Sequence, residues 1–112
     1  MFGFQRLDVY RCAITFLGVS AQLSSRTPRG YGGLADPLRR AALSVPLNVA
    51  EGSGKSPREA ARYYSIARGS ALECAAVLDA FEALGVAEPA NLLDARTLLE
   101  RIVSMLTARR QA

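Results

Sequence analysis

The sequence predicts an all-α fold: an antiparallel four-helix bundle built as a single domain over residues 1–112. Apolar residues recur at spacings of three and four in four separate segments, which is the period of an amphipathic helix. Glycine and proline separate these segments, and the alternating β-branched runs typical of strands do not occur. Half of the residues are hydrophobic, so one domain can build a core without disulfides or a metal.

The first predicted helix covers residues 5–24 and has two apolar stripes. One stripe consists of Leu7, Tyr10, Ile14, Leu17 and Ala21, and the adjoining one of Val9, Ala13, Phe16 and Leu23. Two stripes exceed what a single core face requires. Either this helix lies deep in the bundle, or one stripe meets another subunit.

A loop over residues 25–33, dense in helix breakers, leads to a second predicted helix over residues 34–51. Asp36 and Pro37 are expected to be its N-cap and its first helical residue. Pro46 lies inside the segment and is expected to bend the helix, because proline removes one backbone donor. One apolar stripe nevertheless continues across it, formed by Leu38, Ala42, Val45 and Val49.

The third predicted helix runs from residue 57 to residue 84 and has the clearest start signal. Ser56 is the expected N-cap and Glu59 is expected to close a capping box. Gly85 suits the left-handed position after the helix, and Val86 is expected to fold back on Phe81. The apolar stripe consists of Ala60, Tyr63 or Tyr64, Ala67, Ala71, Cys74, Leu78 and Phe81.

A fourth helix is expected after Pro89, and it again has two apolar stripes. One consists of Leu92, Leu99, Val103 and Leu106, and the other of Leu98, Ile102 and Met105. The two cysteines, Cys12 and Cys74, lie inside apolar helical patterns, so we expect two small buried hydrophobes in a reducing compartment. The chain shows no signal-peptide pattern and no apolar stretch of membrane-spanning length, so a cytoplasmic protein without a membrane partner is expected.

The residue types argue against catalysis. The chain contains no histidine, the commonest general base and metal ligand, so we predict no enzyme activity, no cofactor and no metal site. Residues 52–56, Gly-Ser-Gly-Lys-Ser, match the end of a phosphate-binding P-loop. A P-loop also requires glycine at the position of Val49 and a preceding strand, and neither is present. A weaker hypothesis remains, in which Lys55 and the open start of the third helix bind a phosphate group.

Polar residues face one another across the second and third predicted helices. Asn48 and Glu51 lie near the end of the second, and Ser70 and Glu73 lie midway along the third. Paired carboxylates suggest a di-metal bundle, but such sites also use histidine. We therefore interpret these four residues as a structural hydrogen-bond network, with Arg40 or Arg68 as a counter-charge.

The net charge of +4 is unevenly distributed. Residues 22–68 contain eight basic residues against three acids, whereas residues 69–108 contain two against six. Such asymmetry suggests a surface that attracts phosphates or pairs with a copy of itself, although ordinary solvated helix faces give the same pattern. The candidate residues for nucleic-acid binding are Arg39, Arg40, Lys55, Arg58, Arg62 and Arg68.

Two blocks resemble a known bacterial family. They cover residues 38–52, which include Asn48, Glu51 and Gly52, and residues 66–73, Ile-Ala-Arg-Gly-Ser-Ala-Leu-Glu; the opening residues 4–10 also fit. The chain is thus similar to the four helix bundle proteins, also called 23S rRNA intervening-sequence proteins. The resemblance implies an up-down-up-down bundle and a ring-like homo-oligomer, a pentamer. It also implies that Asn48, Glu51, Ser70 and Glu73 are signature positions.

The leading hypothesis from the sequence is a non-enzymatic homo-oligomeric bundle. It binds RNA, DNA or an enzyme that acts on nucleic acid through residues 39–68, as the local charge and the resemblance suggest. The alternative is a protein-interaction scaffold without nucleic-acid binding, in which the charge asymmetry serves the docking of subunits.

Overall fold

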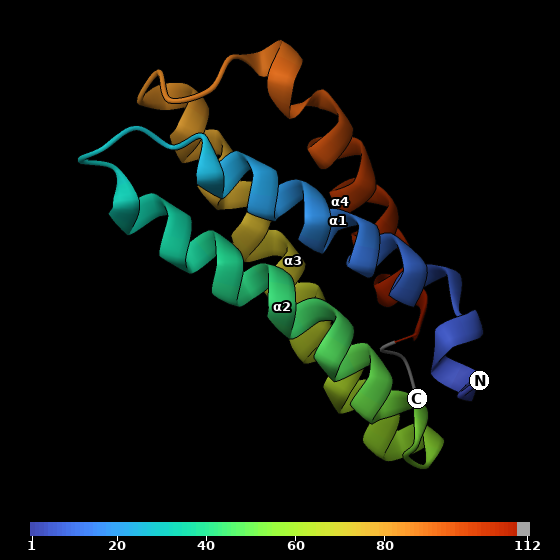
Figure 1. Ribbon diagram of the computed structural model, residues 1–112. Helices are drawn as coiled ribbons and strands as arrows, with labels where there is room; N and C mark the ends of the chain where they lie inside the picture. The colour runs from blue at the N-terminus through green and yellow to red at the C-terminus, as the bar shows by residue number, and fades with distance from the viewer. Residues whose placement is uncertain (110–112) are drawn as a thin grey trace.

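The computed structural model describes residues 1–109 and contains four α-helices and no strand in that part of the chain (Figure 1). The prediction of an all-α fold with four helices is therefore confirmed. The helices are α1 (Asp8–Ser25), α2 (Gly32–Ser53), α3 (Pro57–Ala83) and α4 (Pro89–Arg109), preceded by a short 3₁₀ helix, η1 (Gly3–Arg6).

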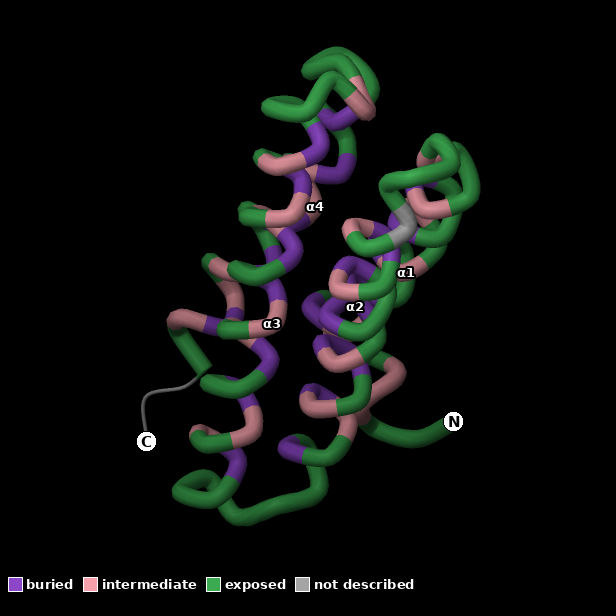
Figure 2. Tube along the Cα trace, turned by 90° about the vertical axis from the view of Figure 1, so that its left-hand side faces the viewer, coloured by how far each residue is buried: buried purple, intermediate pink, exposed green. Residues whose placement is uncertain are grey.

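Each long helix packs against two others and buries one stripe between them. Helices α1 and α3 both contact α2 and α4. Figure 2 shows that the buried residues line the faces that the α1–α2 pair and the α3–α4 pair turn toward each other. The long axis measures 44 Å, and the 27 residues of α3 cover ~40 Å of it at the helical rise. Within the described residues, no helix is long and apolar enough to cross a bilayer.

Helix α1 buries only one of its two apolar stripes. Val9, Ala13, Phe16 and Leu23 lie in the core, together with Cys12 and Ser20. In the other stripe, Ile14 and Ala21 are exposed and the remaining members are half-buried. The helix therefore does not lie deep in the bundle. It also begins three residues later than predicted, because residues 3–6 form η1, where the Phe2 N–H donates to Gln5 Oε1 at 2.7 Å.

The expected roles of Asp36 as N-cap and Pro37 as first residue of α2 were wrong. The helix begins at Gly32, so Asp36 and Pro37 lie in its second turn. Proline there removes only the bond to the Gly33 carbonyl, and burial of Ala35 against the core favours the longer helix. Asp36 pairs instead with Arg39, one turn later. Pro46 lies inside the helix, as predicted, and its ring is fully buried.

Both ends of α3 follow the sequence signals closely. Ser56 Oγ accepts a hydrogen bond from the Glu59 N–H at 3.4 Å. The Glu59 carboxylate does not reach the backbone, as a full capping box would require, but accepts from the Ser56 hydroxyl at 2.9 Å. At the other end, Gly85 has φ +71°, and the Val86 N–H donates to the Phe81 carbonyl at 2.9 Å. This completes a Schellman motif, with Val86 against the core.

The turn between α2 and α3 brings the two helices together at Gly52. A Cβ atom at this position would lie 2.9 Å from Tyr63 Cβ and 3.0 Å from Tyr64 Cε1. Such distances are shorter than van der Waals contact, so only glycine fits without displacement of the tyrosines. Gly52 therefore fixes how closely α2 approaches the first turns of α3. Tyr64, and not Tyr63, is the buried member of the pair that the sequence left open.

Candidate functional site

The structure separates the predicted basic residues into two groups. Arg39 and Arg40 lie in the first half of α2, and ~20 Å of helix separates Arg40 from the end of α2. Lys55 lies in the α2–α3 turn, and Arg58 and Arg62 follow in the first turns of α3. The predicted basic residues therefore do not form one compact cluster.

The second group gains a member that sequence reasoning missed. The guanidinium of Arg109, in the last turn of α4, lies 6.0 Å from the centre of the Tyr64 ring. The last turn of α4 thus reaches the second turn of α3, a contact that depends on the packing of the two helices and that no local sequence signal marks. We call the cluster of Lys55, Arg58, Arg62 and Arg109 the basic end.

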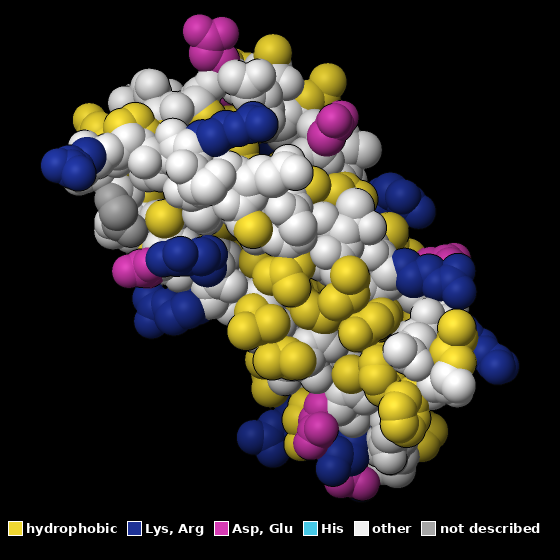
Figure 3. Space-filling model, viewed as in Figure 1, with side chains coloured by type: hydrophobic (Ala, Val, Ile, Leu, Met, Phe, Trp, Pro, Cys, Tyr) yellow, Lys and Arg dark blue, Asp and Glu magenta, His cyan; other side chains and the backbone are white. Residues whose placement is uncertain are grey.

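Two of these side chains remain available for a ligand. Lys55 Nζ lies 3.9 Å from Glu51 Oε1 and 5.7 Å from the centre of the Tyr63 ring. Among the described residues, by contrast, Arg58 and Arg62 make no ion pair, and both are exposed. Because they are four residues apart, they lie on one face of α3. Figure 3 shows basic side chains next to acidic ones at this end of the molecule.

The start of α3 is a weaker anion site than the sequence suggested. The Glu59 carboxylate already lies in the first turn, hydrogen-bonded to the N-cap hydroxyl of Ser56. A carboxylate there supplies the negative charge that the helix dipole favours. A phosphate at Lys55 would therefore depend on side chains rather than on the helix terminus.

Arg68 has a structural position instead. Its Nε donates to Thr107 Oγ1 at 2.8 Å, and the Thr107 hydroxyl donates to the Val103 carbonyl at 2.7 Å. This half-buried bond joins α3 to α4. Arg68 therefore does not belong to the basic end.

The predicted polar network is smaller than expected and contains a residue that was missed. Ser44 and Ser70 hydroxyls lie 2.8 Å apart across α2 and α3. Asn48 Nδ2 donates to the Ser44 carbonyl at 2.9 Å and to its hydroxyl at 3.0 Å. Ser44 lies one turn before Asn48, so helical spacing could have identified it.

The two acids of the predicted network lie outside it. Glu51 and Glu73 are exposed, and Glu51 is the partner of Lys55. Each acid follows its predicted neighbour by three residues, which turns its side chain about 60° away around the helix. That rotation moves both carboxylates from the α2–α3 seam to solvent, so a counter-charge from Arg40 or Arg68 is not needed. The described residues contain no group of three potential ligands placed to hold a metal ion.

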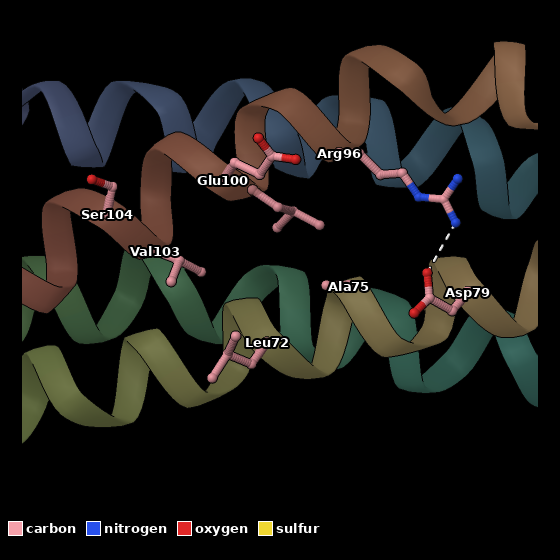
Figure 4. Close-up of a pocket in the computed structure, with 8 residues that line it drawn as sticks. Leu72, Ala75, Asp79, Arg96, Glu100, Val103 and Ser104 are labelled. Atoms are coloured by element: carbon pink, nitrogen blue, oxygen red, sulfur yellow. Dashed lines mark hydrogen bonds and ion pairs between the residues drawn. The ribbon is translucent and has the colours of Figure 1, made fainter.

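A groove of about 440 Å³ runs between α3 and α4 (Figure 4). Its walls are mainly apolar, with Leu72 and Ala75 from α3 and Val103 from α4. At one end Arg96 donates to Glu82 at 2.7 Å and to Asp79 at 2.9 Å. The hydrogen bond to Glu82 raises the pKa of Arg96 above its ordinary value, and the bond to Asp79 raises it further. The groove therefore ends in a fixed ion-pair cluster.

Both cysteines are free and buried, as predicted. Burial, reinforced by the charge of Glu73, raises the pKa of the Cys74 thiol from 9.0 to about 12. We expect Cys74 to resist an aromatic disulfide reagent at mildly alkaline pH and to react once the protein is unfolded in urea, because the thiolate is the nucleophile. Rapid labelling of the native protein at Cys74 would contradict the burial.

The same pKa shift predicts an effect of alkaline pH on stability. The unfolded thiol ionises near 9.0 and the folded one only near 12, so the unfolded state binds fewer protons between these values. The free energy of unfolding should therefore fall as pH rises through this window. Urea unfolding from neutral to alkaline pH measures the fall. Cys74→Ala should show a smaller fall than the wild type, and an equal fall would exclude Cys74 as a cause.

Comparison with known proteins places the chain in a family. The model of the 23S rRNA-intervening sequence proteins matches residues 5–108. No curated protein matches the chain. Because the match extends from η1 through almost all of α4 and includes every helix described above, the chain belongs to the 23S rRNA-intervening sequence protein family.

Proposed function

We propose that this chain is a non-enzymatic bundle protein that assembles with copies of itself and binds nucleic acid through its basic end. The observation that supports this function best is the gathering of Lys55, Arg58, Arg62 and Arg109 where α2, α3 and α4 meet. Arginine guanidinium groups bind phosphate through two parallel hydrogen bonds. Exposed arginines without intramolecular partners are suited to that role.

Self-association is supported by exposed apolar side chains. Ile14 on α1 and Leu43 and Leu47 on α2 are exposed, with Leu47 at 58%. Figure 3 shows apolar side chains gathered over α1 and α2 on one face of the molecule. An apolar surface on one face is typical of a protein–protein contact. The second stripe of α1 thus has a role if it lies between subunits.

The charge distribution favours a contact between unlike faces. Six acids lie exposed between residues 73 and 100, on α3, α4 and their connection, whereas Arg39 and Arg40 lie exposed on α2. A head-to-tail contact between unlike faces closes into a ring when its rotation permits. We propose that the helices alternate in direction as an up-down-up-down bundle and that the ring is a pentamer, as the family resemblance implies. A scaffold without nucleic-acid binding would use the same contact.

Binding of labelled RNA, followed by fluorescence anisotropy at several salt concentrations, tests the basic end. We expect the triple variant Lys55→Ala, Arg58→Ala and Arg62→Ala to weaken binding of a single strand. The slope of log affinity against log salt should fall by ~2 if three phosphate contacts are lost. The matched control is Arg26→Ala, Arg29→Ala and Arg101→Ala, which removes the same charge from exposed positions outside the basic end and should have a much smaller effect.

Two results would contradict the proposal. Equal losses in the two triple variants would show that net charge alone, and not the basic end, governs binding. No binding by the wild type at low salt would leave the scaffold as the better function. Light scattering at increasing protein concentration tests self-association separately, and a monomer at every concentration would exclude it.

A further inference from the structure

A second cavity opens at the basic end, and its walls are aromatic. It has a volume of about 600 Å³, within the range of ligand sites. It lies between η1, the end of α2 and the last turn of α4, and its walls include Phe2, Phe4, Ser53, Tyr64 and Arg109. We call it the aromatic pocket.

Phe2 presents one face of its ring to solvent. It is 72% exposed, yet its ring is stacked on Phe4, with centres 5.7 Å apart and planes 7° apart. Phe4 in turn meets Tyr10 edge-on at 5.0 Å. The Phe2 N–H is also held by Gln5 Oε1. The exposed ring is therefore oriented by its neighbours, although it contributes little to the core.

Another part of the pocket lining combines a ring with a cation. Tyr64 is buried, and the Arg109 guanidinium lies over its ring. Ser53 donates its hydroxyl proton to the Ala50 carbonyl at 2.8 Å, which leaves the oxygen free to accept a hydrogen bond. The lining thus offers a flat apolar surface, a positive charge and a polar acceptor.

We propose that the aromatic pocket binds an unpaired nucleobase of a single-stranded nucleic acid, which stacks on Phe2 while the basic end holds the neighbouring phosphates. This inference rests on the proposed function and adds its substrate class. Proteins that bind single strands combine a positive surface with aromatic side chains in this way, because every base has a π-face. A base in a duplex is already stacked and cannot enter the pocket.

The test compares two labelled strands of equal length, an oligouridine RNA and an abasic ribose-phosphate strand. Both carry the same phosphates, so the basic end alone would bind them equally. We expect the wild type to bind the RNA roughly five- to 150-fold more tightly, the range for loss of one stacked base. Phe2→Ala should remove this preference and Phe2→Tyr should restore it. Leu93→Ala, at an exposed leucine on α4, is the control and should leave it unchanged.

A base analogue gives a second, independent measurement. A short strand that contains 2-aminopurine should lose fluorescence on binding to the wild type, because stacking quenches it, and should lose less on binding to Phe2→Ala. If the wild type bound the oligouridine and the abasic strand with equal, salt-sensitive affinity, base binding by the aromatic pocket would be excluded, whereas phosphate binding by the basic end would stand. Failure of both strands to bind would overturn the proposed function and the pocket together.

Discussion

Replacement of Gly52 by alanine should destabilise the folded protein by about 1–3 kcal/mol, the usual cost of an added methyl group in a packed site. The new Cβ atom would meet Tyr63 Cβ at 2.9 Å and the ring of the buried Tyr64 at 3.0 Å. The first of these atoms is bound directly to the α3 backbone, so it cannot move away by rotation of a side chain. The helices themselves would have to separate.

A matched control for this substitution exists on α3. Gly69 is exposed in the middle of that helix, and no atom beyond the adjoining backbone of α3 lies within 4 Å of the position that an added Cβ would take. Gly69→Ala should therefore stabilise the protein by about 0.4–1 kcal/mol, because alanine restricts the unfolded chain. Urea unfolding followed by circular dichroism, at one fixed protein concentration, measures both variants. Equal effects of the two substitutions would exclude the close approach at Gly52 as the cause.

Phe81→Ala should have the largest effect of any substitution considered for this chain, about 3–5 kcal/mol. The Phe81 ring is only 1% exposed, and its carbonyl accepts the Val86 N–H that closes the Schellman motif. Removal of the ring leaves a cavity where the last turn of α3 meets the start of the next connection. A typical domain has only about 5–15 kcal/mol of stability, so a large part of it would be lost.

The control for Phe81→Ala removes another phenylalanine ring, one that lies on the surface of the protein. Phe2→Ala should change the free energy of unfolding by no more than about 0.5 kcal/mol, because its ring is largely exposed. A large loss in Phe2→Ala would mean that η1 supports the bundle, contrary to the small part that its residues play in the core. A small loss in Phe81→Ala would mean that the end of α3 is not part of the cooperative core.

Local signals in the sequence predicted the ends of a helix well where a single residue determines how the end is capped. Ser56 and Gly85 mark the ends of α3 because each satisfies backbone groups that few other residues can satisfy. The start of α2 was misplaced because Pro37 signals a helix start from local geometry, whereas burial of Ala35 extends the helix beyond it. Local propensity cannot anticipate packing between distant segments.

The candidate site was less predictable because it depends on where helices end relative to one another. Arg58 and Arg62 could be paired from their spacing alone, but Arg109 joins them only because the end of α4 lies beside the start of α3. In the same way, Phe2 and Phe4 have no helical pattern, and only the packing of η1 against α2 makes them walls of a pocket. The Ser44–Ser70 contact joins residues 26 positions apart.

The unequal connections between helices bear on how the chain folds in time. Residues 54–56 alone join α2 to α3, whereas residues 26–31 join α1 to α2 and residues 84–88 join α3 to α4. Closure of the shortest loop costs the least chain entropy, and the contacts that it allows are the most local in sequence. We therefore expect the α2–α3 hairpin to form the folding nucleus, with α1 and α4 docking on it afterwards.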